Sequence, residues 1–334
     1  MSMKEIKYCP SLLTEGFSTY SPGALRRLFQ GKRVSHILPY DAPQKNEADT
    51  EKFLENRKRI SISGVQEKFS LILEKNRLRL TEQGEQGTYI LKPIPRDLKK
   101  VGQVPANEHL TMQIATQVYG INTAACAMIF FKNGDPAYIT RRFDIKGDGS
   151  KLGHEDFATL AGRTSDNAGP NFKYNYSYEE IGTLIRKYVP AWRIEMEKYF
   201  SLVVFNYLFS NGDAHLKNFS LLESDNSDYF LSPAYDLINS SIHMDDTDFA
   251  LDKGLFADEF RSATFEKSNH PGKADFMELS RRLGIDTGRA EKLLFPFLEK
   301  QALVETLTGR SFLDDPVKKG YLLDYNKRRN RLNG

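Results

Sequence analysis

Short apolar runs separated by turn residues fill the first half of the chain, which is the pattern of an antiparallel sheet. The polar tripeptide Glu74-Lys75-Asn76 lies between two of these runs and predicts a hairpin, and Asn133-Gly134 predicts a tight turn between two others. Residues 105–119 carry apolar side chains at helical spacing and predict one inserted helix. The expected strands cover residues 69–73, 77–80, 89–92, 124–131 and 137–143.

Helical periods dominate the second half of the chain. Residues 193–209 are apolar on most faces, so they predict a helix inside a core. Residues 211–236 interrupt the helices with short strands. The other expected helices cover residues 155–161, 177–188 and several segments between 275 and 324. A small sheet followed by a larger helical region predicts an α+β fold with two lobes.

The two ends of the chain carry weaker signals. Residues 21–29 predict a short capped helix with Pro22 near its first turn, a place where proline is favoured. Residues 326–331 are strongly basic. We interpret them as a solvated, frayed end, with contact to nucleic acid as the weaker alternative.

Composition is that of an ordinary globular protein. The 334 residues are 40% hydrophobic and 27% charged, which argues against disorder. The net charge of +3 argues against a protein specialised for binding nucleic acid. Cys9 and Cys126 lie far apart in the sequence, so we expect free thiols in a reducing compartment, with a disulfide as the weaker alternative. No signal peptide or membrane-length apolar run is present, so we expect a soluble, cytoplasmic protein. None of the six histidines has a partner at zinc spacing.

The segment Ser210 to Asn218, directly after the apolar helix, carries the strongest chemical signal. Asp213 is followed five residues later by Asn218, and Asp236 comes after a further short strand. One carboxylate can accept the proton of an attacking hydroxyl, while an amide oxygen and a second carboxylate can hold Mg²⁺. This ordered set predicts phosphoryl transfer, with one of the two carboxylates as the general base.

Phosphoryl transfer also needs groups that hold a nucleotide, and candidates occur upstream. Residues 61–68 are small and polar enough to approach phosphates, although they contain one glycine and a plain turn is the alternative. Lys92 ends an apolar strand and reaches either phosphates or solvent, and Glu108 on the following helix can pair with it. Residues 142–144 (Arg-Phe-Asp) follow the last strand, where a chain crossing between lobes would meet adenine and ribose; a turn is again the alternative.

Together these pieces resemble the HipA-like serine/threonine kinases, the toxin components of bacterial toxin–antitoxin systems. The matching pieces occur in the order found in that family, at residues 61–68, 90–93, 142–144, 154–157, 211–220 and 235–236. The resemblance implies a bilobal, protein-kinase-like fold and a serine/threonine protein kinase that uses ATP and Mg²⁺. It divides the chain into residues 1–60, an extension packing on the small lobe, 61–145, a nucleotide-binding small lobe, and 146–334, a helical catalytic lobe.

The resemblance also assigns roles to single residues. Asp213 would be the general base, and Asn218 with Asp236 would hold Mg²⁺. Because related kinases phosphorylate a serine in the first loop, we expect autophosphorylation of Ser61, Ser63 or both. The implied ATP-binding residues are Ser63, Gly64, Val65, Gln66, Glu67, Lys68, Lys92, Arg141, Arg142, Phe143, Asp144, His215, Lys217, Asn218, Tyr235 and Asp236.

The partners follow from the same resemblance. Too little chain precedes Ser61 for the N-terminal subdomain of longer members, so the chain is similar to the short HipT form, in which a separate HipS-like protein supplies it. A helix-turn-helix HipB-like antitoxin would be a second partner, with DNA contacted only through it and no contact with a membrane. The implied protein substrate is an aminoacyl-tRNA synthetase.

Two other functions stay open at this point. One is a catalytically idle nucleotide-binding scaffold that recruits an antitoxin to DNA, although the full set of Lys92, Asp213, Asn218 and Asp236 argues against it. The other is a small-molecule kinase, since a fold does not fix a substrate.

Overall fold

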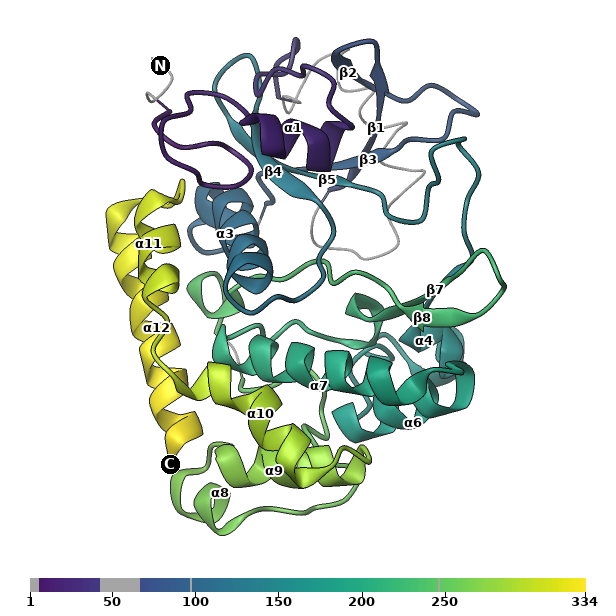
Figure 1. Cartoon of the computed structure of the whole chain (residues 1–334), viewed down its shortest axis with the longest axis vertical. Helices are drawn as coiled ribbons and strands as arrows, with labels where there is room; N and C mark the ends of the chain where they lie inside the picture. Colours follow the sequence, from purple (N-terminus) through teal and green to yellow (C-terminus); the bar gives the residue numbers. More distant parts are fainter. Residues whose placement is uncertain (1–5, 43–66, 97, 246) are drawn as a thin grey trace. The chain divides into compact units, whose positions relative to one another are not determined.

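The computed structural model describes residues 6–42, 67–96, 98–245 and 247–334 (Figure 1). The chain divides into two compact units, which we treat separately. Unit 1 consists of Met1–Ile114, Ala124–Arg142 and Thr306–Lys318. Unit 2 consists of Ala115–Thr123, Phe143–Glu305 and Lys319–Gly334.

Unit 1 is built on a five-stranded antiparallel sheet with the order β2-β1-β3-β5-β4. β1 and β2 form the expected hairpin, and Lys75 adopts the left-handed conformation (φ 54°) in its turn. β3 is the central strand, where Lys92 lies opposite Tyr138 of β5. The strands are β1 (Phe69–Glu74), β2 (Arg77–Leu80), β3 (Tyr89–Pro93), β4 (Cys126–Phe130) and β5 (Pro136–Arg141).

The N-terminal residues share a core with this sheet. Helix α1 (Pro22–Phe29) begins after Ser21, whose hydroxyl oxygen accepts a hydrogen bond from the amide of Ala24 at 3.2 Å. The hydroxyl of Tyr89 on β3 donates to the carbonyl of Leu28 at 3.1 Å, which ties helix to strand. The buried core of this part includes Cys9, Tyr20, Leu28, Phe29, Phe69, Leu71, Leu91, Ile129 and Ile139.

Helix α3 (Val104–Gln117) follows a 3₁₀ turn, η1 (Val101–Gln103), and carries Glu108. Its N-terminal end is tied to a distant part of the chain, because Gln103 and Asp314 exchange hydrogen bonds of 2.9 and 2.8 Å. The ring of Phe312 also contacts the buried His109, with ring centroids 6.4 Å apart. Part of the C-terminal third therefore completes unit 1.

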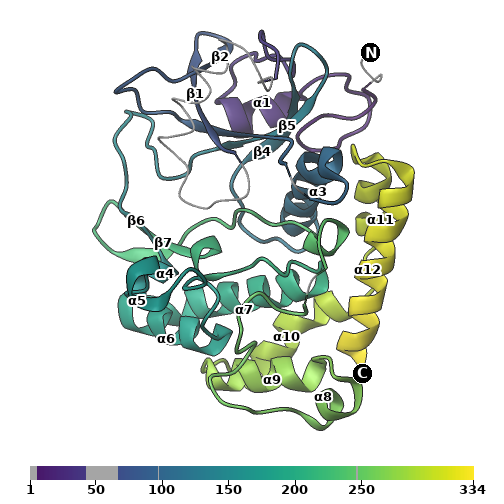
Figure 2. The ribbon, with the colours of Figure 1, turned by 180° about the vertical axis from the view of Figure 1, so that it is seen from behind.

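Unit 2 is mainly helical (Figure 1). Its helix α7 (Trp192–Leu208) is buried along much of its length. Helix α6 (Tyr178–Tyr188) begins at a capping box in which Ser177 and Glu180 bond each other's backbone amides. Figure 2 shows the short helices α4 and α5 next to α6. The other helices are α4 (Phe157–Leu160), α5 (Ser165–Ala168), α8 (Ala263–Ser268), α9 (Lys273–Arg282), α10 (Thr287–Leu298), and α11 (Ala302–Arg310) and α12 (Asp315–Asn333), which both have residues in each unit.

A small antiparallel sheet also belongs to unit 2, in the order β6-β7-β8. The strands are β6 (His154–Asp156), β7 (Ser220–Glu223) and β8 (Tyr229–Leu231). The helix expected over 155–161 is therefore wrong at its start, because residues 154–156 pair with β7. Asp156 ends the strand and caps α4: its Oδ1 accepts the amide of Thr159 at 2.9 Å.

The basic residues 326–331 do not form a frayed end, and that expectation is wrong. They continue α12, which extends to Asn333. Arg328 is 8% exposed, and its guanidinium pairs with Asp248 and lies over the ring of Tyr207. Burial and pairing, rather than solvation, hold the positive charge of Arg328, whereas Lys327 is exposed.

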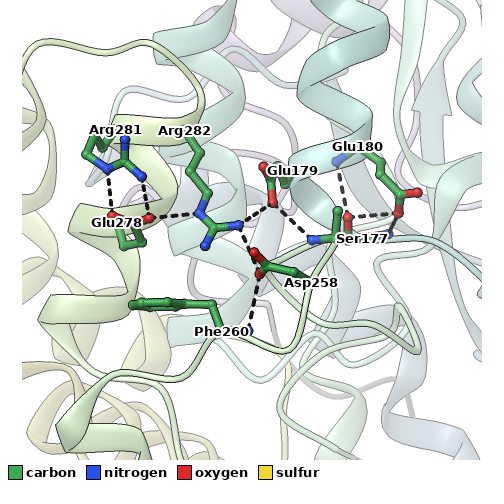
Figure 3. Close-up of polar contacts among 9 residues, drawn as sticks. Ser177, Glu179, Glu180, Asp258, Phe260, Glu278, Arg281 and Arg282 are labelled. Carbon is green, nitrogen blue, oxygen red and sulfur yellow. Dashed lines mark hydrogen bonds and ion pairs between the residues drawn. The ribbon is translucent and has the colours of Figure 1, made fainter.

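A charged cluster joins α6, α9 and the segment around Asp258 (Figure 3). Arg282 is its centre and pairs with Glu179 at 3.1 Å, Asp258 at 3.0 Å and Glu278 at 2.8 Å. Its guanidinium also lies over the ring of Phe260, 5.2 Å from the centroid. Hydrogen bonds from Arg281 and Arg282 lower the pKa of Glu278 to about 2. The cluster fixes the segment that forms one wall of a cleft described below.

Among the described residues, no helix combines the length and apolar character needed to cross a membrane. Cys9 and Cys126 are buried free thiols, as expected.

Candidate phosphoryl-transfer site

The segment Ser210 to Asn218 is held by hydrogen bonds at its beginning. Ser210 follows α7 in the left-handed conformation (φ 52°). Asn211 turns back on the helix, since its backbone amide and its Nδ2 donate to the carbonyl and the Oδ1 of Asn206 at 2.8 and 2.9 Å. The amide of Gly212 donates to the hydroxyl of Ser240 at 2.7 Å. These bonds fix the backbone immediately before Asp213.

Asp213 presents its carboxylate to solvent, with 47% of the side chain exposed. The hydroxyl of Tyr174 donates to Oδ1 of Asp213 at 2.9 Å. This contact orients one oxygen of the carboxylate, and the exposure leaves the group reachable by an incoming hydroxyl. The position suits a general base.

His215 lies behind the carboxylate, with Nε2 3.8 Å from Oδ1 of Asp213. The side chain is 4% exposed, and burial, together with the charge of Lys173, lowers its pKa to about 3. The ring is therefore neutral at pH 7 and places no positive charge beside Asp213. Its Nδ1 is buried and has no hydrogen-bond partner among the described residues.

Asn218 is one of the two residues expected to hold Mg²⁺. Its Oδ1 is buried, and no described residue donates a hydrogen bond to it. Burying an amide oxygen without a hydrogen-bond donor costs free energy of folding. A bound cation or a water molecule would remove that cost. An amide oxygen is a ligand type that Mg²⁺ accepts, so the residue fits the predicted metal role.

Asp236 is joined to the Asn218 segment through its neighbour in sequence. The hydroxyl of Tyr235 donates to the carbonyl of Lys217 at 2.9 Å, so the residues preceding Asp236 and Asn218 are bonded to each other. Asp236 itself adopts the left-handed conformation (φ 55°). No group of three or more His, Cys, Asp or Glu side chains suited to a metal occurs among the described residues. A Mg²⁺ site in a kinase does not require one, because phosphate oxygens and water complete the shell.

Three aromatic rings from different segments gather next to this point. The Phe143 ring lies 5.7 Å from that of Tyr235 and 5.2 Å from that of His154. His154 in turn contacts the hydroxyl of Ser220 at 2.7 Å. Burial raises the pKa of Tyr235, so its hydroxyl stays protonated. The structure thus brings together Phe143 and Tyr235, two of the residues expected around a nucleotide.

Two more predicted residues are engaged in unit 2. Lys217 pairs with Oδ2 of Asp156 at 3.2 Å, on the strand that the sequence pattern had suggested was helical. Asp144 is 5% exposed, and its carbonyl accepts the amide of Leu152 at 2.8 Å. Its backbone is thereby built into a turn.

Unit 1 contains the predicted lysine. Nζ of Lys92 lies 2.5 Å from Oε1 of Glu108, and both side chains are 3% exposed, which confirms the expected pair. The ammonium also lies over the ring of Tyr138, 5.3 Å from its centroid. Arg141 and Arg142 end the sheet, with their amides donating to the carbonyls of Ala125 and Thr88 at 2.8 and 2.9 Å.

The predicted phosphate loop falls mostly outside the described residues. Ser61, Ser63, Gly64, Val65 and Gln66 belong to that part. Glu67 and Lys68 are described, and Glu67 pairs with Arg96 at 3.2 Å.

A cleft of about 1370 Å³ opens within unit 2 on the other end of the same loop. Ser210, Asp248, Phe260 and Arg328 are among the residues that line it. The described residues of its wall do not include Asp213, Asn218 or Asp236. The cleft therefore lies apart from the residues that the sequence singles out for phosphoryl transfer.

The model of the HipA-like C-terminal domain matches residues 60–302, which is more than half of the chain. The chain belongs to the HipA-like family. A protein of Haemophilus influenzae named "Putative kinase" is 28% identical over all of this chain and 98% of its own length. "Putative kinase Y4dM" of Sinorhizobium fredii is 30% identical over 75% of this chain and 61% of its own.

A solved structure extends the likeness to the fold. The Shewanella oneidensis HipA chain, in a complex with HipB and operator DNA, superposes with a TM-score of 0.63 at 21% identity. The match covers 82% of this chain and 65% of the HipA chain. The α+β, kinase-like fold expected from the sequence is thereby confirmed.

Several residues that shape the site of this HipA-like chain were not found from the sequence. Tyr174, Ser240 and Arg328 each contact the loop 210–213 from a segment far along the chain. Nothing in the local sequence marks them, because tyrosine, serine and arginine are common and their partners are distant.

Proposed function

We propose that this HipA-like protein is an ATP- and Mg²⁺-dependent serine/threonine protein kinase. One observation carries the proposal: the buried Oδ1 of Asn218 has no donor among the described residues, in the same loop as the exposed carboxylate of Asp213. Phosphoryl transfer requires a general base and a ligand for a cation, and this loop offers candidates for both, five residues apart.

In the proposed reaction one bond to the γ-phosphorus of ATP forms and one breaks. The hydroxyl oxygen of a serine or threonine forms a bond to the γ-phosphorus of ATP, and the bond from that phosphorus to the β,γ-bridging oxygen breaks. ADP leaves with the electron pair, and Asp213 accepts the hydroxyl proton. Tyr174 holds Oδ1 of Asp213 at 2.9 Å and so limits the directions from which the hydroxyl can approach.

Proposed nucleotide-binding residues occur in the described part of each unit. Lys92 contacts the phosphates. The carboxylate of Glu108, 2.5 Å from Nζ, holds the Lys92 side chain in one rotamer. Phe143 and Tyr235 contribute to the adenine and ribose side, together with Arg141, Arg142 and Asp144.

Asn218 and Asp236 would hold Mg²⁺ in the loaded enzyme. The ion would neutralise charge on the phosphates. The neutral His215 suits this arrangement, since a cationic ring next to the metal ligands would repel the ion.

We further propose that the kinase acts as the toxin of a toxin–antitoxin system. The support is the family membership, together with the presence of HipB and operator DNA in the Shewanella oneidensis HipA complex. The proposed partners are a HipB-like and a HipS-like antitoxin protein, and the proposed substrate is a serine of an aminoacyl-tRNA synthetase. Because this chain spans 65% of that HipA chain, the partners need their own test.

Autophosphorylation of Ser61, Ser63 or both completes the proposal. A phosphoserine adds a charge of roughly −1.5 to −2, which would repel the phosphates of ATP and switch the kinase off. Intact-mass measurement after incubation with ATP should reveal added phosphate on the wild type and none on Asp213→Asn.

The basic test uses γ-labelled ATP with dephosphorylated casein as the acceptor. We expect label in phosphoserine or phosphothreonine, and none when EDTA removes Mg²⁺. Absence of transfer both to casein and to the protein's own serines, with ATP still bound, would refute the kinase assignment and favour the idle scaffold.

A further inference from the structure

Arg328 is buried within the basic segment 326–331 and contacts the loop of Asp213. It lies on α12, beyond residue 302, where the family match ends. Its Nε donates to the hydroxyl oxygen of Ser210 at 3.2 Å. The C-terminal helix therefore reaches the first residue of the catalytic loop.

Ser210 needs such support. It is a non-glycine residue with φ 52°, a conformation that L-amino acids disfavour. Its carbonyl accepts hydrogen bonds from the amide and the hydroxyl of Ser240, at 3.0 and 2.9 Å. The same hydroxyl oxygen of Ser240 accepts the amide of Gly212 at 2.7 Å. A change at Ser210 is thus passed by two hydrogen bonds to the peptide that precedes Asp213.

Arg328 is itself rigidly held. Its Nη1 pairs with Oδ1 of Asp248, while the other oxygen of that carboxylate contacts Nδ1 of His270 at 2.7 Å. The guanidinium lies over the ring of Tyr207 on α7, 5.0 Å from the centroid. Arg331 adds a longer contact of 3.4 Å to Asp248.

This combination demands arginine. A planar guanidinium can stack on a ring, pair with one carboxylate and donate a further N–H at a fixed angle, which an ammonium cannot do at once. The residue also lines the cleft together with Ser210, so water rather than neighbouring side chains would fill the space left by a shorter one.

We propose that Arg328 is a positioning residue: through Ser210 and Ser240 it sets the backbone of Gly212 and thereby the carboxylate of Asp213. The inference rests on the proposed function as far as catalysis is concerned. The predicted effect of Arg328 on the rigidity of the loop backbone does not depend on catalytic activity.

The experiment compares Arg328→Met, which keeps an unbranched side chain without the guanidinium, with Ser210→Ala, which removes the acceptor, and with the double variant. Lys327→Met is the matched control, since Lys327 is the exposed cation next in sequence. The first readout is backbone hydrogen exchange at residues 211–213. We expect faster exchange in both single variants, no further increase in the double variant, and the wild-type rate in Lys327→Met.

The second readout is casein phosphorylation. A misplaced base costs about 10- to 100-fold in kcat, with KM for ATP within about threefold of wild type, and the two substitutions should not add. Wild-type exchange and kcat in Ser210→Ala, or additive losses in the double variant, would overturn the proposal. If Arg328→Met does not fold, Ser210→Ala decides by the same two measurements. An inactive wild type would count against the kinase assignment, while the exchange data would still judge Arg328.

Discussion

The ammonium group of Lys92 lies 2.5 Å from the carboxylate of Glu108 inside unit 1, with both side chains 3% exposed. Removing one member of a buried ion pair is far more costly than replacing both, because the remaining charge keeps its desolvation penalty. The pair can therefore be tested for structure and for catalysis separately.

Lys92→Met should lower the free energy of unfolding by about 3–5 kcal/mol and abolish phosphoryl transfer. The double variant Lys92→Met/Glu108→Leu should recover most of the stability, as measured by urea denaturation, yet stay inactive. Recovery of activity along with stability would mean that Lys92 acts only in the fold.

The buried Oδ1 of Asn218 predicts an unusual response to substitution. Asn218→Leu should raise the stability of the metal-free protein by about 1 kcal/mol, because it removes an acceptor that no described residue satisfies. The same variant should lose the extra thermal stabilisation that Mg²⁺ gives in the presence of ATP.

Asn226→Leu, in an exposed turn, is the control and should keep the Mg²⁺ response of the wild type. Scanning calorimetry with ATP, with and without Mg²⁺, measures both effects. An undiminished Mg²⁺ response in Asn218→Leu would exclude this residue as a ligand.

His109 predicts a dependence of stability on pH. Burial lowers its pKa to about 4, and its Nε2 lies 2.8 Å from the carbonyl of Ser11. Since the unfolded chain has a histidine pKa of about 6.5, it binds more protons than the folded protein between these values. Stability from the neutral ring is present above pH 6.5 and is lost, by up to about 3 kcal/mol, as pH falls to 4.

His109→Gln keeps a donor for Ser11 and cannot titrate. Its free energy of unfolding, measured with urea from pH 4 to 6.5, should fall less steeply by up to about 1.4 kcal/mol per pH unit. Equal slopes in the variant and the wild type would show that His109 does not titrate as its burial requires.

How far the sequence predicts this structure depends on whether the signal is local. The capping box of Ser177 and Glu180 and the turn at Lys75 involve neighbours in sequence, and the corresponding elements form where expected. The strand His154–Asp156 has three residues, too few to show a period, so its pairing with β7 was missed.

In the candidate site, too, residues with a local signal were recognised and residues with distant partners were not. Asp213, Asn218 and Asp236 are recognisable because their spacing is fixed along the chain. Arg328 looked like part of a solvated tail, since its partners Ser210 and Asp248 lie 118 and 80 residues away. Likewise, no local pattern reveals that residues 306–318 complete unit 1, because the contact of Asp314 with Gln103 spans 211 residues.

The central claim is that the carboxylate of Asp213 is the general base. Asp213→Asn keeps the size and the hydrogen bond from Tyr174 but cannot accept the substrate proton. Asp228→Asn, in an exposed turn of the same unit, makes the same chemical change elsewhere. The measurement is the single-turnover rate of phosphate transfer from ATP to casein, with ATP saturating for each protein. We predict a loss of about 10²- to 10⁴-fold for Asp213→Asn at an unchanged melting temperature, and the wild-type rate for Asp228→Asn. A wild-type rate in Asp213→Asn would contradict the account.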